Sequence, residues 1–96
     1  MERYRTFKQF WPFYVSQHMK PWNRKLHFIG TTLVLACLCA SVWSKWFLAT
    51  APLAGYGFAW IGHFFIEKNR PATFTYPFWS LIGDFKMYWL MWRGKM

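Results

Sequence analysis

The sequence predicts an all-α protein built on an integral membrane helical hairpin, with an interfacial or re-entrant helix on each side of it. Two uncharged apolar runs, residues 26–43 and 46–66, contain 18 and 21 residues. As transmembrane helices they would be roughly 27 and 31 Å long, which is close to the thickness of the bilayer core. Only Ser44 and Lys45 separate them. Residues 1–96 are therefore expected to form one membrane-embedded helical domain.

The basic residues predict the orientation of this hairpin. Eleven of the 12 Lys and Arg residues lie outside it, and only Lys45 lies at its turn. This asymmetry predicts that both termini are cytoplasmic, in a bacterial inner membrane or in the endoplasmic reticulum of a eukaryote. The net charge of +9 is expected to attract anionic membrane lipid and not nucleic acid. With 55% hydrophobic and 25% aromatic residues, the chain is too apolar for a disordered basic tail.

The segment before the hairpin, residues 4–19, predicts an interfacial helix. Pro12 suits the first turn of a helix that runs to about Met19, and Pro21 would stop that helix. The segment is too charged at its start to span a membrane. Its aromatic residues fall at helical spacing and lead to a histidine: Phe7, Phe10, Trp11, Tyr14 and His18.

The hairpin is expected to bring two further histidines to one level. His27 lies 17 residues before Ser44, and His63 lies 18 residues after Lys45. Antiparallel helices would place both imidazoles at the membrane surface on the side of the termini. The short connection at residues 21–25 would let His18 face His27. Gly62 directly precedes His63 and is expected to leave room for a ligand or metal beside the backbone.

Two acidic residues are candidates for the same site. His63 and Glu67 are four residues apart and share a helix face, although pairing with nearby basic residues explains Glu67 equally well. Residues 78–92 predict an aromatic helix of roughly 22 Å, which is short for a membrane span. Asp84 and Lys86 make this helix interfacial or re-entrant. The face that could look toward the histidines carries Ser80, Asp84, Tyr88 and Met91.

Three histidines at one level favour a metal site over three separate structural roles. Imidazole suits zinc, iron, copper and nickel, and two or three histidines with a carboxylate and open positions suit ferrous iron that handles oxygen. The sequence contains no HExxH motif, no glycine-rich phosphate loop and no Ser-His-Asp order. Cys37 and Cys39 lie far from the histidines along the first predicted helix and are interpreted as packing residues.

These motifs resemble those of a known family, the small membrane proteins related to the fungal 2-hydroxy fatty acid dioxygenase of the phytosphingosine pathway (Mpo-like). The resemblance covers roughly residues 7–87. It implies an Fe(II)-dependent enzyme of fatty acid α-oxidation, in which the motif histidines bind iron. The matching residues are His18, Asn23-Arg24 and His27, then Gly62 to Glu67 with Pro71-Ala72, then Pro77, Ser80-Leu81 and Asp84.

The resulting hypothesis is oxidative removal of C1 from a long-chain 2-hydroxy fatty acid by O₂. His18, His27 and His63 would hold Fe(II), and Glu67 and Asp84 would complete the catalytic residues by orienting the ligands or joining them. The substrate-binding candidates are Asn23, Arg24, Lys25 and Arg70. Two alternatives remain open: a haem-binding or electron-carrier hairpin that uses His27 and His63, and a non-catalytic lipid-binding membrane protein. An oligomer is compatible with all three hypotheses.

Overall fold

The computed structural model describes residues 3–96, and in this range it contains four α-helices and no strand. A π-helical segment follows the third helix, and a short 3₁₀ turn precedes the fourth. The all-α class is therefore confirmed. The elements are α1 (Phe7–Ser16), α2 (Pro21–Ala40), α3 (Trp46–Ile61), η1 (Gly62–Glu67), η2 (Ala72–Phe74) and α4 (Pro77–Trp92).

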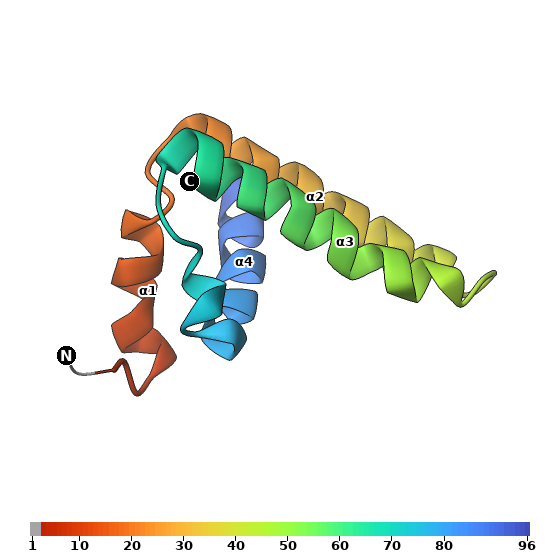
Figure 1. Cartoon of the computed structure of the whole chain (residues 1–96), viewed down its shortest axis with the longest axis horizontal. Coiled ribbons are helices and arrows are strands. Elements are labelled where there is room, and N and C mark those ends of the chain that lie inside the picture. Colours follow the sequence, from red (N-terminus) through yellow and green to blue (C-terminus); the bar gives the residue numbers. More distant parts are fainter. Residues whose placement is uncertain (1–2) are drawn as a thin grey trace.

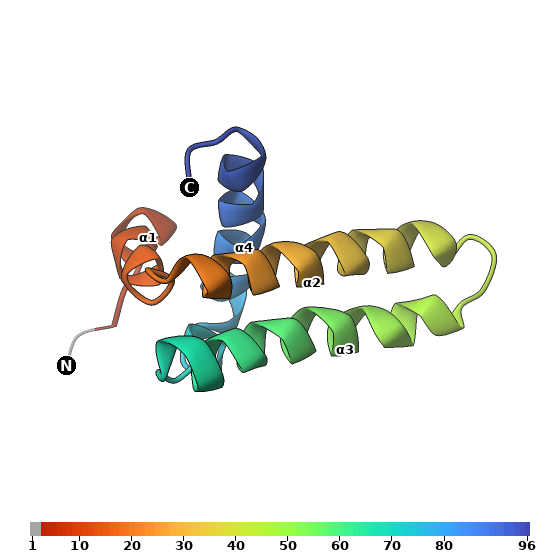
Figure 2. The same cartoon turned by 90° about the horizontal axis from the view of Figure 1, so that it is seen from above.

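The α2 and α3 helices form the expected antiparallel hairpin and lie side by side along their length (Figures 1 and 2). Glycine allows this close approach at two places. A Cβ atom at Gly30 would lie 3.0 Å from Cβ of Phe58, and one at Gly55 would lie 2.9 Å from Cγ2 of Val34. Larger residues at either position would push the two helices apart.

The α1 and α4 helices pack across one end of the hairpin, where α2 begins and α3 ends (Figure 1). The other end of the hairpin extends away from them (Figure 2). Aromatic side chains of α1 meet the η2 region and α4 in a core with little exposed surface. Its buried members are Phe10, Tyr14, Ala72, Tyr76 and Met87.

The start and end of α1 differ from the prediction, although α4 covers the predicted residues 78–92. The α1 helix begins at Phe7, because the hydroxyl of Thr6 caps its start by accepting the N–H of Gln9 at 3.2 Å. The helix ends at Ser16. Pro12 therefore lies inside α1 and not in its first turn. Pro21 does not stop α1, which already ends at Ser16; it is the first residue of α2, a position where its missing N–H costs nothing.

The predicted membrane spans are wrong. No helix within residues 3–96 combines the length and the apolar character that crossing a bilayer requires. The α2 helix has 20 residues, but it starts at Pro21 and includes Arg24 and Lys25. The α3 helix has only 16 residues, because the chain changes to π-helical geometry at Gly62. The predicted integral membrane localisation is therefore wrong, and the orientation inferred from the basic residues no longer applies.

Candidate metal centre

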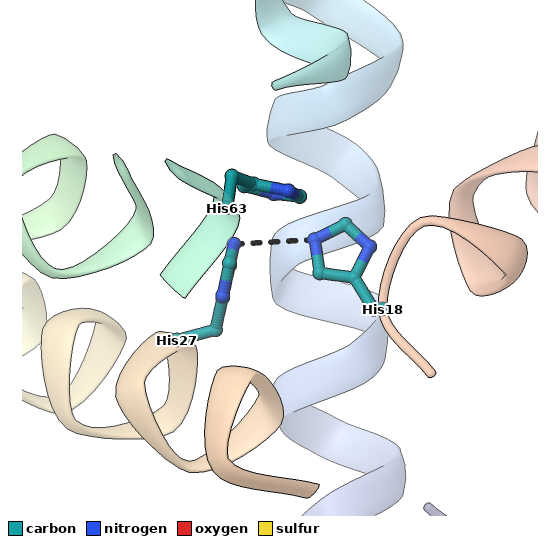
Figure 3. A group of neighbouring side chains, drawn as sticks. All are labelled: His18, His27 and His63. Carbon is teal, nitrogen blue, oxygen red and sulfur yellow. Dashed lines mark hydrogen bonds between the residues drawn. The ribbon is translucent and has the colours of Figure 1, made fainter. Parts of the chain in front are cut away.

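The three histidines meet where α1, the start of α2 and η1 come together (Figure 3). His18 lies in the connection between α1 and α2, His27 lies in α2, and His63 lies in η1. Each has at most 5% of its surface exposed, and one ligand atom from each lies within 4.8 Å of the other two. The rings stand nearly perpendicular to one another. The predicted convergence is confirmed, and these side chains could hold a metal ion.

The hydrogen bonds of the three rings fix which nitrogen faces the centre. Nδ1 of His18 lies 2.7 Å from the carbonyl oxygen of Tyr14, and Nδ1 of His27 lies 3.0 Å from that of Asn23. A carbonyl oxygen only accepts, so both Nδ1 atoms carry a proton and donate. Nδ1 of His63 lies 2.7 Å from Oδ1 of Asn69, whose Nδ2 donates to a backbone carbonyl. All three Nε2 atoms are therefore left with a lone pair.

The arrangement of these lone pairs fits a cation. Nε2 of His18 and Nε2 of His27 lie 3.2 Å apart, a contact drawn as a dashed line in Figure 3. Because the single proton of each neutral ring is on Nδ1, neither Nε2 atom carries a proton. Burial lowers the pKa of His27 to about 4 and lowers the pKa of His18 and His63 below the usual value, so a proton does not fill the gap at neutral pH. A metal ion binds neutral imidazoles through such lone pairs. The donor set is therefore that of a metal site.

The π-helical segment η1 positions His63. Its widened turn is closed by the N–H of Lys68, which donates to the carbonyl of His63, and the N–H of Asn69 donates to the same carbonyl at 2.9 Å. Segments of this kind are frequent at functional sites. Gly62 does not leave space for a ligand as expected, because the side chain of Asn23 fills that space. A Cβ atom at Gly62 would lie 1.9 Å from Oδ1 of Asn23, so the contact between η1 and α2 requires glycine.

The two predicted acids contact residues that position the histidines. Oε1 of Glu67 accepts the backbone N–H of Lys20 at 2.6 Å, which places this carboxylate at the positive N-terminal end of α2. Oδ1 of Asp84 accepts the hydroxyl of Tyr14 at 2.5 Å, and the Tyr14 ring stacks on His18 with a centroid distance of 4.0 Å. Burial raises the pKa of Asp84 to about 7.

The predicted substrate-binding residues are distributed around the centre. Nε of Arg24 donates to the carbonyl of His18 at 2.6 Å, and the buried Asn23 approaches Glu67 at 3.4 Å. The Lys25 ammonium lies over the ring of Trp22, and the Arg70 guanidinium lies over the ring of Phe74. Arg24 and Asn23 thus adjoin the histidines, and the role of all four residues in binding a substrate stays a prediction.

A small cavity borders the histidines, with about 20 Å³ of room for water-sized molecules. Asp84 and Ser80 of α4 line it, and the buried Ser80 hydroxyl has no hydrogen-bond partner among the described residues. Sequence reasoning missed Asn69 and the hydroxyl of Tyr14. Tyr14 could have been found, since it lies one helical turn before His18. No spacing rule points to Asn69, because its contact with His63 depends on the π-helical turn.

The fold and this site define an all-α protein with a buried centre of three histidines. The chain belongs to the Mpo1-like family, described as 2-hydroxy-palmitic acid dioxygenase Mpo1-like, which matches residues 4–96. This match confirms the resemblance that the histidine motifs indicated. No curated protein and no solved structure matches the chain.

Proposed function

We propose that this protein is an Fe(II)-dependent dioxygenase that removes C1 from 2-hydroxy fatty acids. The observation that carries the proposal is the convergence of three neutral, buried imidazoles with unprotonated Nε2 atoms facing one another. The family description, which names a 2-hydroxy-palmitic acid dioxygenase, supports the same reaction. Imidazole ligands with open positions suit ferrous iron in oxygen chemistry.

The reaction balances with O₂ as the only oxidant. The acid R–CH(OH)–COOH and one O₂ give R–COOH, CO₂ and water, so the bond between C1 and C2 breaks and C2 becomes the new carboxyl carbon. Fe(II) held by His18, His27 and His63 would supply the electrons that activate O₂ and a binding point for the hydroxy acid. The protein residues around the centre bind, orient and desolvate the substrate.

The residues beside the histidines suit the head group of such an acid. The Arg24 guanidinium, held at the His18 carbonyl, can neutralise the substrate carboxylate. Ser80 presents an unpaired buried hydroxyl to the cavity and can donate to a substrate oxygen. The Tyr14 ring stacks on the His18 ring, and Asp84 fixes Tyr14 by accepting its hydroxyl proton. Burial of the three histidines would shield the reacting atoms from bulk water.

The geometry disfavours a haem site between His27 and His63. The centroid of the His18 ring lies 4.5 Å from each of those two rings, which leaves no room for a macrocycle between them. The bordering cavity is also close to the size of one water molecule. A haem would need a cavity of several hundred Å³.

The experiment that tests the proposed function compares matched acids. Iron-loaded protein should convert 2-hydroxyhexadecanoic acid to pentadecanoic acid, with one CO₂ released for each O₂ consumed. Hexadecanoic acid is the control and should not react, because it lacks the hydroxyl at C2. Equal turnover of both acids, or turnover under argon, contradicts the proposal.

A further inference from the structure

An apolar groove of about 360 Å³ runs along the hairpin between α2, α3 and α4. Its volume falls in the range of small-molecule sites, roughly 300 to 1,000 Å³. All three helices contribute apolar side chains to its walls. These include Val34 and Leu38 of α2, Leu48 and Ala51 of α3, and Leu81 and Phe85 of α4.

One end of this groove is polar and adjoins the candidate metal centre. His27 and Asp84 line both the groove and the small cavity beside the histidines. Tyr56 and Ala59 of α3 also border both spaces. The groove therefore lies next to the histidine cavity and shares four lining residues with it, so that it has a polar end at His27 and an apolar end along the hairpin. This polarity matches a molecule with a polar head and a long apolar tail.

The length of the groove matches an extended hydrocarbon chain. On α2 it runs from His27 to Leu38, and on α3 it runs from Ala59 back to Leu48. Each stretch spans roughly 16 Å at 1.5 Å per residue. An extended chain advances about 1.25 Å per methylene, from a carbon–carbon bond near 1.5 Å, so the groove accommodates roughly 13 methylenes. Leu38 and Leu48 are 44% and 53% exposed, which leaves the far end open.

We propose that this groove binds the acyl chain of a 2-hydroxy fatty acid, with the head group at the histidines and the chain end near Leu48. The inference rests on the proposed function and adds the part of the protein that selects chain length. The α3 side of the groove carries a small residue at every fourth position, which leaves space for a ligand beside the helix: Ala51, Gly55 and Ala59. Because Gly55 is needed for contact with Val34, Ala51 is the position to enlarge.

The central test narrows the groove at Ala51. This residue precedes Ala59 by eight positions, or roughly 12 Å, which corresponds to about ten methylenes. Ala51→Phe should lower kcat/KM for 2-hydroxyhexadecanoic acid by at least about tenfold, because several methylenes lose their buried contacts. 2-Hydroxyoctanoic acid ends before the obstruction, and its kcat/KM should stay within about twofold of wild type. The matched control is Ala49→Phe, at an exposed position outside the groove.

Because Ala51 is buried, Ala51→Phe could misfold, and a second variant and a binding measurement test the proposal independently of it. Leu48→Trp changes an exposed residue at the far end and should also reduce turnover of the long acid but not of the short one. Binding is followed separately by NMR with hexadecanoic acid that carries a nitroxide at its terminal carbon. The nitroxide should broaden the methyl resonances of Leu48 and Leu38 and spare that of Met19, which is 60% exposed and precedes α2 at the opposite end of the hairpin.

The outcomes distinguish failure of the groove proposal from failure of the proposed function. If wild-type protein oxidises neither hydroxy acid, the proposed function fails, and the nitroxide measurement still tests chain binding. If folded Ala51→Phe protein retains turnover of the long acid, or loses both acids equally, the groove proposal is overturned. It is also overturned if the nitroxide broadens Met19 as strongly as Leu48. A change of oligomeric state in Ala51→Phe with unaltered chain-length preference would assign the groove to a contact between copies.

Discussion

The Nε2 atoms of His18 and His27 face each other at 3.2 Å, and the Nδ1 atom of each ring is held by the carbonyl of the residue four positions earlier. These carbonyls, of Tyr14 and Asn23, force the protonated nitrogen of each ring away from the centre. Two buried lone pairs at this distance repel unless a cation lies between them. The backbone near each histidine thus orients the pair so that both Nε2 atoms could ligate a metal ion.

Replacing any one histidine should remove the function of all three. Alanine at His18, His27 or His63 should lower activity by at least about 100-fold, and double replacements should be no worse than single ones, because the remaining ligands no longer fix the metal. Steady-state assays with 2-hydroxyhexadecanoic acid measure this. Survival of activity and iron in His18→Ala would reassign the third ligand to Glu67 or Asp84.

Asn69 should matter for metal affinity although it provides no ligand. Its Oδ1 accepts the Nδ1 proton of His63 and thereby keeps Nε2 unprotonated. Asn69→Ala should weaken iron binding by about 10- to 100-fold, the usual effect of removing such a partner. Asn69→Asp retains an acceptor and should recover most of this loss. Competition with a chelator measures the affinity, and equal affinities of wild type and Asn69→Ala would contradict the role assigned to Asn69.

Replacing Gly57 of α3 and Gly62 of η1 by alanine should change the stability of the protein in opposite directions. Gly62→Ala would drive a methyl group into Asn23 and should destabilise the protein by about 1 to 3 kcal/mol, as overpacking usually does. A methyl group at Gly57 meets no atom within 4 Å, so Gly57→Ala should stabilise the helix by up to about 1 kcal/mol. Urea unfolding compares the pair. Equal effects would show that Asn23 does not pack against Gly62.

The metal-free protein should lose stability on acidification. Burial lowers the pKa of the histidines, that of His27 to about 4, whereas an unfolded histidine titrates near 6.5. The unfolded chain therefore takes up protons first as the pH falls through about 6.5, and this favours unfolding. Asp84, with a pKa raised to about 7, acts in the opposite direction between about 7 and 4, but it is one group against three.

Urea midpoints at about pH 7.5 and about pH 5 measure this dependence. Wild-type protein should have the lower midpoint at the lower pH, and His27→Gln should show a smaller difference because one of the three groups is gone. A wild-type midpoint that is constant, or that rises on acidification, would mean that the histidines are not neutral in the folded protein.

The sequence was sufficient to predict the hairpin, the helix at residues 78–92 and the meeting of the three histidines. The last followed from counting residues outward from Ser44 and Lys45, because two antiparallel helices with equal rise bring equal counts to one level. Residue counts did not give the limits of the helices. The α3 helix changes to π-helical geometry at Gly62, where Asn23 packs against Gly62 and Asn69 donates to the carbonyl of Gln17, and both of these contacts are tertiary.

The wrong membrane prediction has the same origin. The apolar runs at residues 26–43 and 46–66 were treated as helices with the same limits as the runs. The α2 helix instead takes in Arg24 and Lys25, and α3 stops as an α-helix at Ile61. The partners that hold the histidine rings were hard to foresee for a related reason: two of them are backbone carbonyls, which no residue type reveals.

The measurement that tests the metal centre most directly is iron analysis of anaerobically purified protein, combined with X-ray absorption at the iron edge. The expected result is one Fe(II) per chain with histidine nitrogen in its first coordination sphere, and no bound iron when His18, His27 and His63 are all replaced by alanine. Wild-type protein that binds no iron, or a triple variant that binds as much iron as wild type, would contradict it.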